Sequence, residues 1–206
     1  MLTRRRILAG LVALTALAVA APTLAGRRDS KPAHEQALGQ LINNVRYGQD
    51  NTALTFLDGP LQGPVLLGDA WGKGTAEQQA EFIKLFHHLF AAVAFPKMRD
   101  SFQHLTTVTY DAPKAAGDRV EVGSVLHIQA GPKEQELKLV YSLSKAADGA
   151  LKVVDVTIVG EASMLASIRD DQITPIMAEG GWPKLLELLR ARAKDLPAIV
   201  DQPLKK

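Results

Sequence analysis

Two adjacent histidines, His87 and His88, are the side chains of this 206-residue chain best suited to metal binding or proton transfer. Neighbouring helix positions point about 100° apart, so the pair cannot easily hold one metal ion, and no His-Glu-x-x-His motif accompanies it. The sequence contains no cysteine, which excludes a thiolate nucleophile, a disulfide and a cysteine-ligated metal. We therefore interpret the histidines as the polar flank of a helix, and we expect neither a metal ion nor a cofactor.

The segment Gly68–Thr75 has the glycines and the lysine of a phosphate-binding loop, but their spacing is wrong. The motif needs a glycine where Leu67 stands and a serine or threonine where Gly74 stands. No Gly-x-Ser-x-Gly elbow of a serine hydrolase occurs, and the acids Asp170–Asp171 are interpreted as solvated helix charges. Asp155 is interpreted as a buried hydrogen-bonding group. Because no nucleophile, base and orienting group come together, we expect the protein not to be an enzyme.

The N-terminus has the pattern of an export signal. Three arginines, Arg4–Arg6, precede an apolar run over Ile7–Ala21 that is short for a membrane span and ends in small residues. Cleavage is predicted after Ala25, which makes residues 1–25 a signal peptide of the general secretory or the twin-arginine type. Removing three of the 24 basic residues leaves 21 against 22 acids, a net charge of about −1. This balance argues against a nucleic-acid partner.

The remaining residues 26–206 are long enough for one domain with a substantial core. A first helix is predicted over Ala33–Tyr47. The stretch Gln49–Lys73, rich in glycine and proline, is expected to wind through short turns. The terminal segment Pro197–Lys206 is expected to be a loosely attached tail.

The most regular predicted element is a helix that begins at Thr75. Thr75 and Gln78 have the spacing of a capping box, and apolar residues follow with helical periodicity. Pro96 is expected to end or bend this helix, with a further helix over Lys97–Leu105. The apolar stripe consists of Phe82, Leu85, Phe86, Leu89, Phe90 and Val93.

After this helix the hydrophobic period falls to two, which is typical of strands. Short polar turns separate the apolar runs, which favours a meander of four antiparallel strands. The predicted strands are Thr106–Ala112, Arg119–Ala130, Gln135–Ser144 and Leu151–Val159. Their inward side chains include Val108, Tyr110, Val120, Val122, Leu126, Leu139 and Tyr141. The fold class is therefore α+β, a four-stranded antiparallel sheet covered by N- and C-terminal helices.

The C-terminal third joins the last strand directly to short amphipathic helices. The strand breaks at Gly160, and helices restart at Thr174–Pro175 and Trp182–Pro183. Between them lies an apolar helical stripe made of Met164, Leu165 and Ile168. The strand and this stripe must share one apolar layer, which is either a solid core or the wall of a cavity.

Short motifs follow one another along the chain: Leu67-Gly68-Asp69-Ala70-Trp71, Thr75-Ala76-Glu77-Gln78, Lys152-Val153-Val154-Asp155-Val156, Gly160, Ser163, Arg169, Gly180-Gly181 and Leu185–Leu189. In this order and spacing they resemble the MlaC-type family, also called the toluene-tolerance family. The chain departs from the family pattern at Leu151 and Ile168, where an aromatic residue and a tyrosine are usual. These departures leave the identity of the ligand open, and another amphiphile such as a hopanoid or a sterol-like lipid is an alternative.

The resemblance implies a monomeric periplasmic carrier of phospholipid. It implies partners at both membranes: an outer-membrane lipoprotein complex and an inner-membrane MCE-type ABC transporter. The expected site is an apolar cavity between sheet and helices, with Arg169, Tyr141 and Trp71 at its rim. The residues expected to bind lipid are Phe82, Leu85, Phe86, Leu89, Phe90, Val93, Val108, Tyr110, Val120, Val122, Leu126, Leu139, Tyr141, Leu165 and Arg169. Two alternatives are a small enzyme or ligand sensor on a cystatin- or NTF2-like scaffold and a pure protein adaptor with a solid core.

Overall fold

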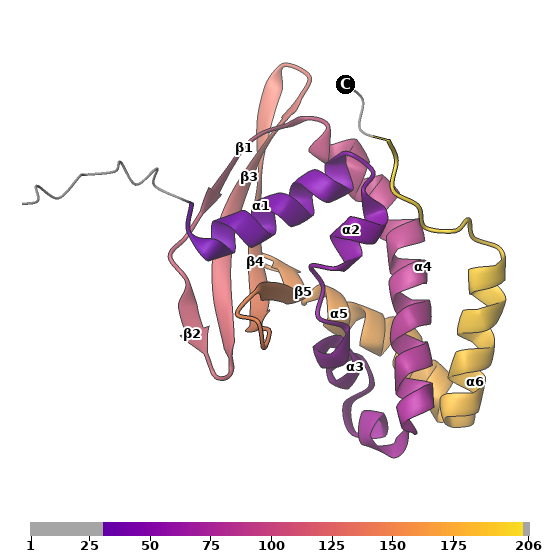
Figure 1. Cartoon of the computed structure of the whole chain (residues 1–206). Coiled ribbons are helices and arrows are strands. Elements are labelled where there is room, and N and C mark those ends of the chain that lie inside the picture. Colours follow the sequence, from indigo (N-terminus) through magenta and orange to yellow (C-terminus); the bar gives the residue numbers. More distant parts are fainter. Residues whose placement is uncertain (1–30, 204–206) are drawn as a thin grey trace, which may run out of the picture. The chain divides into compact units, whose positions relative to one another are not determined.

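An antiparallel sheet forms one layer of the computed structural model, which describes residues 31–203 (Figure 1). The strands are β1 (Leu105–Tyr110), β2 (Lys114–Ala116), β3 (Arg119–Ala130), β4 (Lys133–Lys145) and β5 (Leu151–Ile158). Their order is β1-β3-β4-β5, and β2 also pairs with β3. The four predicted strands are therefore present as a meander.

The short strand β2 lies within the segment that the sequence predicted as a turn. β1 pairs with β3 from Ser124 onward, so the first residues of β3 have no partner in β1. β2 pairs there, with Ala115 opposite Val120. A sheet of five strands rather than four results, because β3 is longer than β1 and its free edge is covered by β2.

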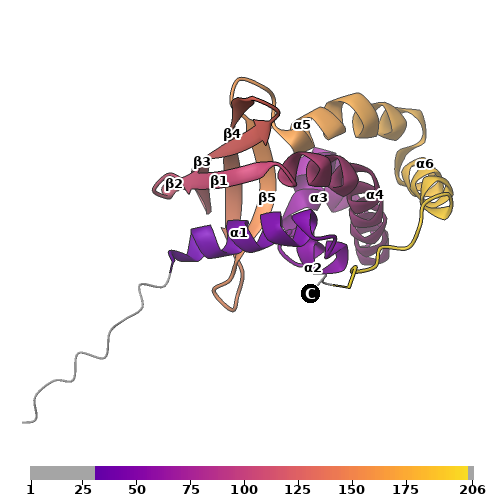
Figure 2. The ribbon, with the colours of Figure 1, turned by 90° about the horizontal axis from the view of Figure 1, so that it is seen from above.

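Helices lie on one face of the sheet and beside its β5 edge (Figures 1 and 2). They are α1 (Ala33–Arg46), α2 (Asp50–Leu54), α3 (Gly59–Leu67), the 3₁₀ helix η1 (Gly68–Lys73), α4 (Ala76–Phe102), α5 (Met164–Ile168), the π-helix η2 (Arg169–Ile173) and α6 (Thr174–Lys194). α1 crosses the sheet, whereas α4 and α6 lie side by side away from it. The predicted α+β class is confirmed.

The long helix α4 begins as predicted but ends later. The Thr75 N–H donates to Gln78 Oε1 at 2.9 Å, and the Gln78 N–H donates to Thr75 Oγ1 at 3.3 Å, which is the capping box. Of the two effects predicted for Pro96, an end of the helix is wrong, because α4 continues through it to Phe102 and includes most of the further helix predicted over Lys97–Leu105. Pro96 is exposed, so water can bind the carbonyl that loses its donor, while Phe95 and Phe102 keep the helix packed.

The stretch predicted as turns contains α2, α3 and η1 instead. Asp58 caps α3, its Oδ1 accepting from the Leu61 N–H at 3.2 Å. Pro60 occupies the first turn of α3, where a backbone N–H has no partner within the helix. The missing N–H of proline therefore costs no helical hydrogen bond there. Proline at this position begins a helix, and the sequence interpretation treated it as a turn signal.

The C-terminal segment is docked on the molecule as far as the structure describes it, so the predicted loose tail is wrong. Asp201 Oδ1 accepts from the backbone N–H groups of Asn51 (2.7 Å) and Thr52 (3.3 Å), and its Oδ2 accepts from Thr52 Oγ1 (2.8 Å). These donors belong to the first turn of α2, whose own N-cap side chain makes no such bond. Ile199 packs on a cluster that includes Phe95. Asp201 therefore caps α2 from the far end of the chain.

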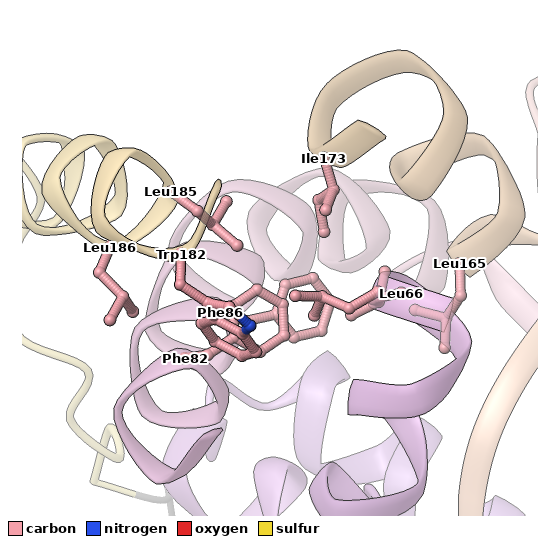
Figure 3. Packing of buried hydrophobic residues seen from close by; sticks show 9 residues of the cluster. Leu66, Phe82, Phe86, Leu165, Ile173, Trp182, Leu185 and Leu186 are labelled. Atoms are coloured by element: carbon pink, nitrogen blue, oxygen red, sulfur yellow. The ribbon is translucent and has the colours of Figure 1, made fainter. Parts of the chain in front are cut away.

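The described residues belong to one compact unit with three apolar clusters. One joins α3, α4, α5 and α6 around Phe82 and Trp182 (Figure 3). The second lies between the sheet and Leu38 of α1, and the third joins α1, α2 and α4. Phe90 contacts all three. The predicted signal peptide lies outside the described residues, and within 31–203 no helix is long and apolar enough to span a membrane.

Candidate functional site

A cavity of about 450 Å³ lies among the sheet, α1, α4 and α5. Its walls come from α1, α4, β4, β5 and the segment 161–168, with Leu57 and Gln62 adding to them. The apolar lining consists of Leu41, Ile42, Val45, Leu57, Phe86, Phe90, Phe95, Met98, Phe102, Leu137, Leu139, Val153, Val154, Val156, Ile158, Ala162, Met164, Leu165 and Ile168. The polar lining consists of Gln62, Ser101, Tyr141, Asp155, Glu161 and Ser167. The sequence left open whether the layer shared by β5 and α5 is a solid core or a cavity wall, and in the structure it is a cavity wall.

Gln62 is buried in this wall and uses both ends of its amide. Its Nε2 donates to the Val154 carbonyl of β5 at 3.1 Å. Its Oε1 lies 2.7 Å from His87 Nε2, which is therefore the donor. Burial lowers the pKa of His87, so the ring remains neutral at neutral pH. The pair fixes α3 and α4 to β5, and no sequence pattern marked Gln62 beforehand.

Asp155 has the structural role that the sequence predicted. The side chain is buried, and its Oδ1 accepts from the Val156 N–H at 2.8 Å and the Leu165 N–H at 3.0 Å. The second donor lies in the first turn of α5, which Ser163 also caps by accepting from Ala166 at 3.2 Å. Asp155 thus fixes α5 to the end of β5 through two backbone donors to its Oδ1.

Two tyrosines of the sheet, Tyr110 and Tyr141, are neutral at neutral pH because burial raises the pKa of both hydroxyl groups. Burial raises the pKa of Tyr141, which lines the cavity. Burial, with a contribution from Glu35, raises the pKa of Tyr110 to about 12. Within residues 31–203 no group of three or more metal-binding side chains comes together. The arrangement can bind an apolar ligand, and two of its polar side chains, Gln62 and Asp155, are occupied in fixing the walls.

The structure brings a subset of the predicted lipid-binding residues together. Phe86 and Phe90 of α4, Leu139 and Tyr141 of β4, and Leu165 of α5 all line the cavity. They come from three separate parts of the sequence.

The other predicted residues lie elsewhere, because α1 rather than α4 covers most of the sheet. Phe82 packs in the helical cluster (Figure 3). Leu85 packs against this cluster, and Leu89 lies outside the cavity lining. Val93 is 50% exposed. The strand residues that pack beneath α1 with Leu38 are Val108, Tyr110, Val120, Val122 and Leu126. The apolar face of α4 drifts around the helix axis, so Met98 and Phe102 face the cavity while Val93 does not.

Arg169 and Trp71 are also away from the cavity. Arg169 Nε donates to Asp170 Oδ1 at 2.7 Å, and this pair raises the pKa of Arg169. Arg169 lines a second, open hollow of about 520 Å³ beside η1 and α6. Trp71 packs on Phe82 and Trp182, with ring centroids 6.2 and 6.0 Å away.

The sequence interpretation missed the contribution of α1 to the cavity. The sequence predicted a helix over Ala33–Tyr47 but assigned none of its residues to the site, and Leu41, Ile42 and Val45 of this helix line the cavity. Ile158 and Met164 were recognised as part of an apolar layer without a choice between core and cavity. Hydrophobic periodicity shows which face of a helix or strand is apolar, but it does not show which other element packs against that face.

Comparison with known proteins identifies the family to which this chain belongs. The sequence model of the family described as MlaC protein matches residues 35–191. A similar solved structure is a phospholipid-binding protein from Ralstonia solanacearum in complex with a phospholipid. It superposes with a TM-score of 0.62 and 20% sequence identity, over 79% of this chain and 96% of that one. No curated protein matches the chain. The family match covers most of the sequence, and the chain belongs to the MlaC family.

Proposed function

We propose that this protein is a phospholipid carrier of the periplasm. The observation that supports the proposal is an apolar cavity of about 450 Å³, enclosed by sheet and helices, in a chain of the MlaC family. A relative of the same fold is a phospholipid-binding protein. Ligand cavities are typically about 300–1,000 Å³, so this one has the size of a binding site. A packing defect would be smaller.

The volume matches one acyl chain. An engineered apolar cavity of about 150 Å³ binds benzene, which has six carbon atoms. By that ratio this cavity has room for about 18 carbon atoms. A phospholipid has two such chains, so the second chain requires the walls to move apart or stays at the mouth.

The energetics are those of exchange with a membrane. Burial of an acyl chain yields about 0.8 kcal/mol per CH₂ relative to water, or on the order of 10 kcal/mol for a long chain. A bilayer offers nearly the same free energy, so transfer between bilayer and cavity is close to balanced. Partners must then give transport its direction. We infer that these are an outer-membrane lipoprotein complex and an inner-membrane MCE-type ABC transporter.

The test is the identity of whatever co-purifies with the protein. Native mass spectrometry of gently purified protein should show a mass increment that lipid extraction identifies as phospholipid. The variant Phe90→Glu, which places a carboxylate in the cavity wall, should lose this increment because an acyl chain cannot solvate a charge. Val93→Glu is the matched control, since Val93 lies on the same helix but is half-exposed.

Circular dichroism separates loss of lipid from loss of fold in both variants. A wild-type protein that carries no lipid, and takes none from vesicles, would refute the carrier function. A hopanoid or sterol-like molecule in the extract would keep the carrier and replace the phospholipid.

A further inference from the structure

The charged side chains that line the cavity are both acids. They are Asp155 and Glu161, and no lysine or arginine of residues 31–203 lines it. The lining therefore has a negative bias that the overall composition, with nearly equal acids and bases, does not predict. A ligand that enters this cavity meets carboxylates and no cation.

The two acids differ in position. Asp155 is buried, and two backbone N–H groups already occupy its Oδ1. Glu161 is exposed and stands in the turn between β5 and α5, where its N–H donates to the Ile158 carbonyl at 2.9 Å. Ile158 is 39% exposed although it lines the cavity, and Ala162 is exposed as well. Together with Ser101 of α4, which is exposed as well, these three residues are the lining residues that reach solvent, so Glu161 is at the mouth.

Two basic side chains that are adjacent in sequence to lining residues, Lys138 and Arg169, are turned to other partners. Lys138 alternates with two leucines of β4 that line the cavity, so its side chain lies on the opposite face of the sheet. There its Nζ is 3.8 Å from Glu136 Oε2. Arg169 binds Asp170 and lines the second hollow. Glu161 itself forms no ion pair with any residue from 31 to 203.

We propose that Glu161 makes the carrier selective for phospholipids whose headgroup ends in an ammonium group. This inference rests on the proposed function, because an acyl chain in the cavity places its headgroup at the mouth. An ammonium group there is attracted by the Glu161 carboxylate, whereas a headgroup with net negative charge is repelled. Both lipid classes share a phosphate, to which the hydroxyl groups of Ser101 and Ser167 in the lining can donate hydrogen bonds. Zwitterionic lipid is the preferred cargo and anionic lipid the disfavoured one.

A competition experiment tests the selectivity. The full chain, delipidated, is incubated with vesicles of equal parts phosphatidylethanolamine and phosphatidylglycerol with identical acyl chains. Native mass spectrometry then gives the ratio of the two lipids bound. We expect about a fivefold excess of phosphatidylethanolamine, the factor that one contact of unit charges at about 4 Å gives in water. At about 1 M salt, where the screening length falls to about 3 Å, the excess should shrink.

Variants assign the effect to one side chain. Glu161→Gln should bring the ratio to that of the vesicle, and Glu161→Lys should invert it. Glu187→Gln, on the exposed side of α6, should keep the wild-type ratio. Because Glu161 is exposed, these changes should leave the unfolding temperature unchanged.

Two results would overturn the inference separately from the proposed function. A wild type that loads lipid in the vesicle ratio refutes the selectivity and keeps the carrier. An excess that Glu161→Gln leaves intact refutes the role of Glu161. A protein that loads neither lipid refutes the carrier and the selectivity with it.

Discussion

Removing the Asp201 carboxylate should destabilise the protein, although this residue lies near the end of the chain. In the structure it accepts three hydrogen bonds from Asn51 and Thr52, and two of them come from backbone N–H groups of the first turn of α2. Loss of an N-cap side chain costs about 1 kcal/mol, within a range of about 0.5–2 kcal/mol. For a chain of this size, that lowers the unfolding temperature by about 2–4 °C. Asp201→Ala should show this shift in thermal unfolding followed by circular dichroism.

Two further variants separate the cap from the rest of the segment. Asp201→Asn retains an acceptor oxygen and should lose less than the alanine variant. Truncation after Ala198 also removes Ile199 from its cluster with Phe95, so it should cost about 2–3 kcal/mol in total.

Asp195→Ala is the control, because the exposed Asp195 carboxylate accepts no hydrogen bond from the part of the chain that the structure describes. An Asp201→Ala protein that unfolds at the wild-type temperature would show that the segment is not held by this cap, and the reasoning would fail.

Two other perturbations test the packing around the site. Burial lowers the pKa of His87 in the folded state, so the unfolded state binds its proton more readily; stability should be constant above about pH 6.5 and fall as the pH drops below it. Urea unfolding at a series of pH values, compared with His87→Gln, checks this, and an equal pH dependence in both proteins would contradict it. Gly74→Ala places a Cβ 2.5 Å from the ring of Trp182 and should cost about 1–3 kcal/mol. Gly72→Ala, which meets no atom within 4 Å, should cost less in the same unfolding assay.

The sequence predicted the elements that are determined by residues close together in the chain. The strand over Arg119–Ala130 has the predicted bounds, since its alternation and its flanking turns lie within one short window. The capping box of α4 likewise depends on residues three apart. The break at Gly181, with φ 61°, separates the two parts of α6 where a new helix start was predicted. Each of these features is encoded by neighbours in the chain.

The elements that were missed depend on contacts between distant residues. Asp201 caps α2 across 149 residues of sequence to Thr52, and no local pattern distinguishes it from a solvated acid. Gln62 is buried because Val154 and His87 face it, at separations of 92 and 25 residues. The cavity itself was predicted between α4 and the middle strands, whereas α1 covers them. Hydrophobic periodicity cannot decide which helix covers a given strand.

The cavity persists because polar ties fix its frame while the lining stays apolar. Gln62 joins α3 and α4 to β5, and Asp155 joins α5 to the same strand. At the other side, Arg99 of α4 binds the Val45 carbonyl at 3.0 Å and Asp50 at 2.6 Å, which holds α4 against α1 and α2. Each tie has a buried or half-buried geometry that a shift of the helices would break, leaving polar groups unpaired. Collapse of the walls into a solid core would therefore break these hydrogen bonds and strain the helices. An acyl chain can fill the space while the hydrogen bonds and the helices stay as they are.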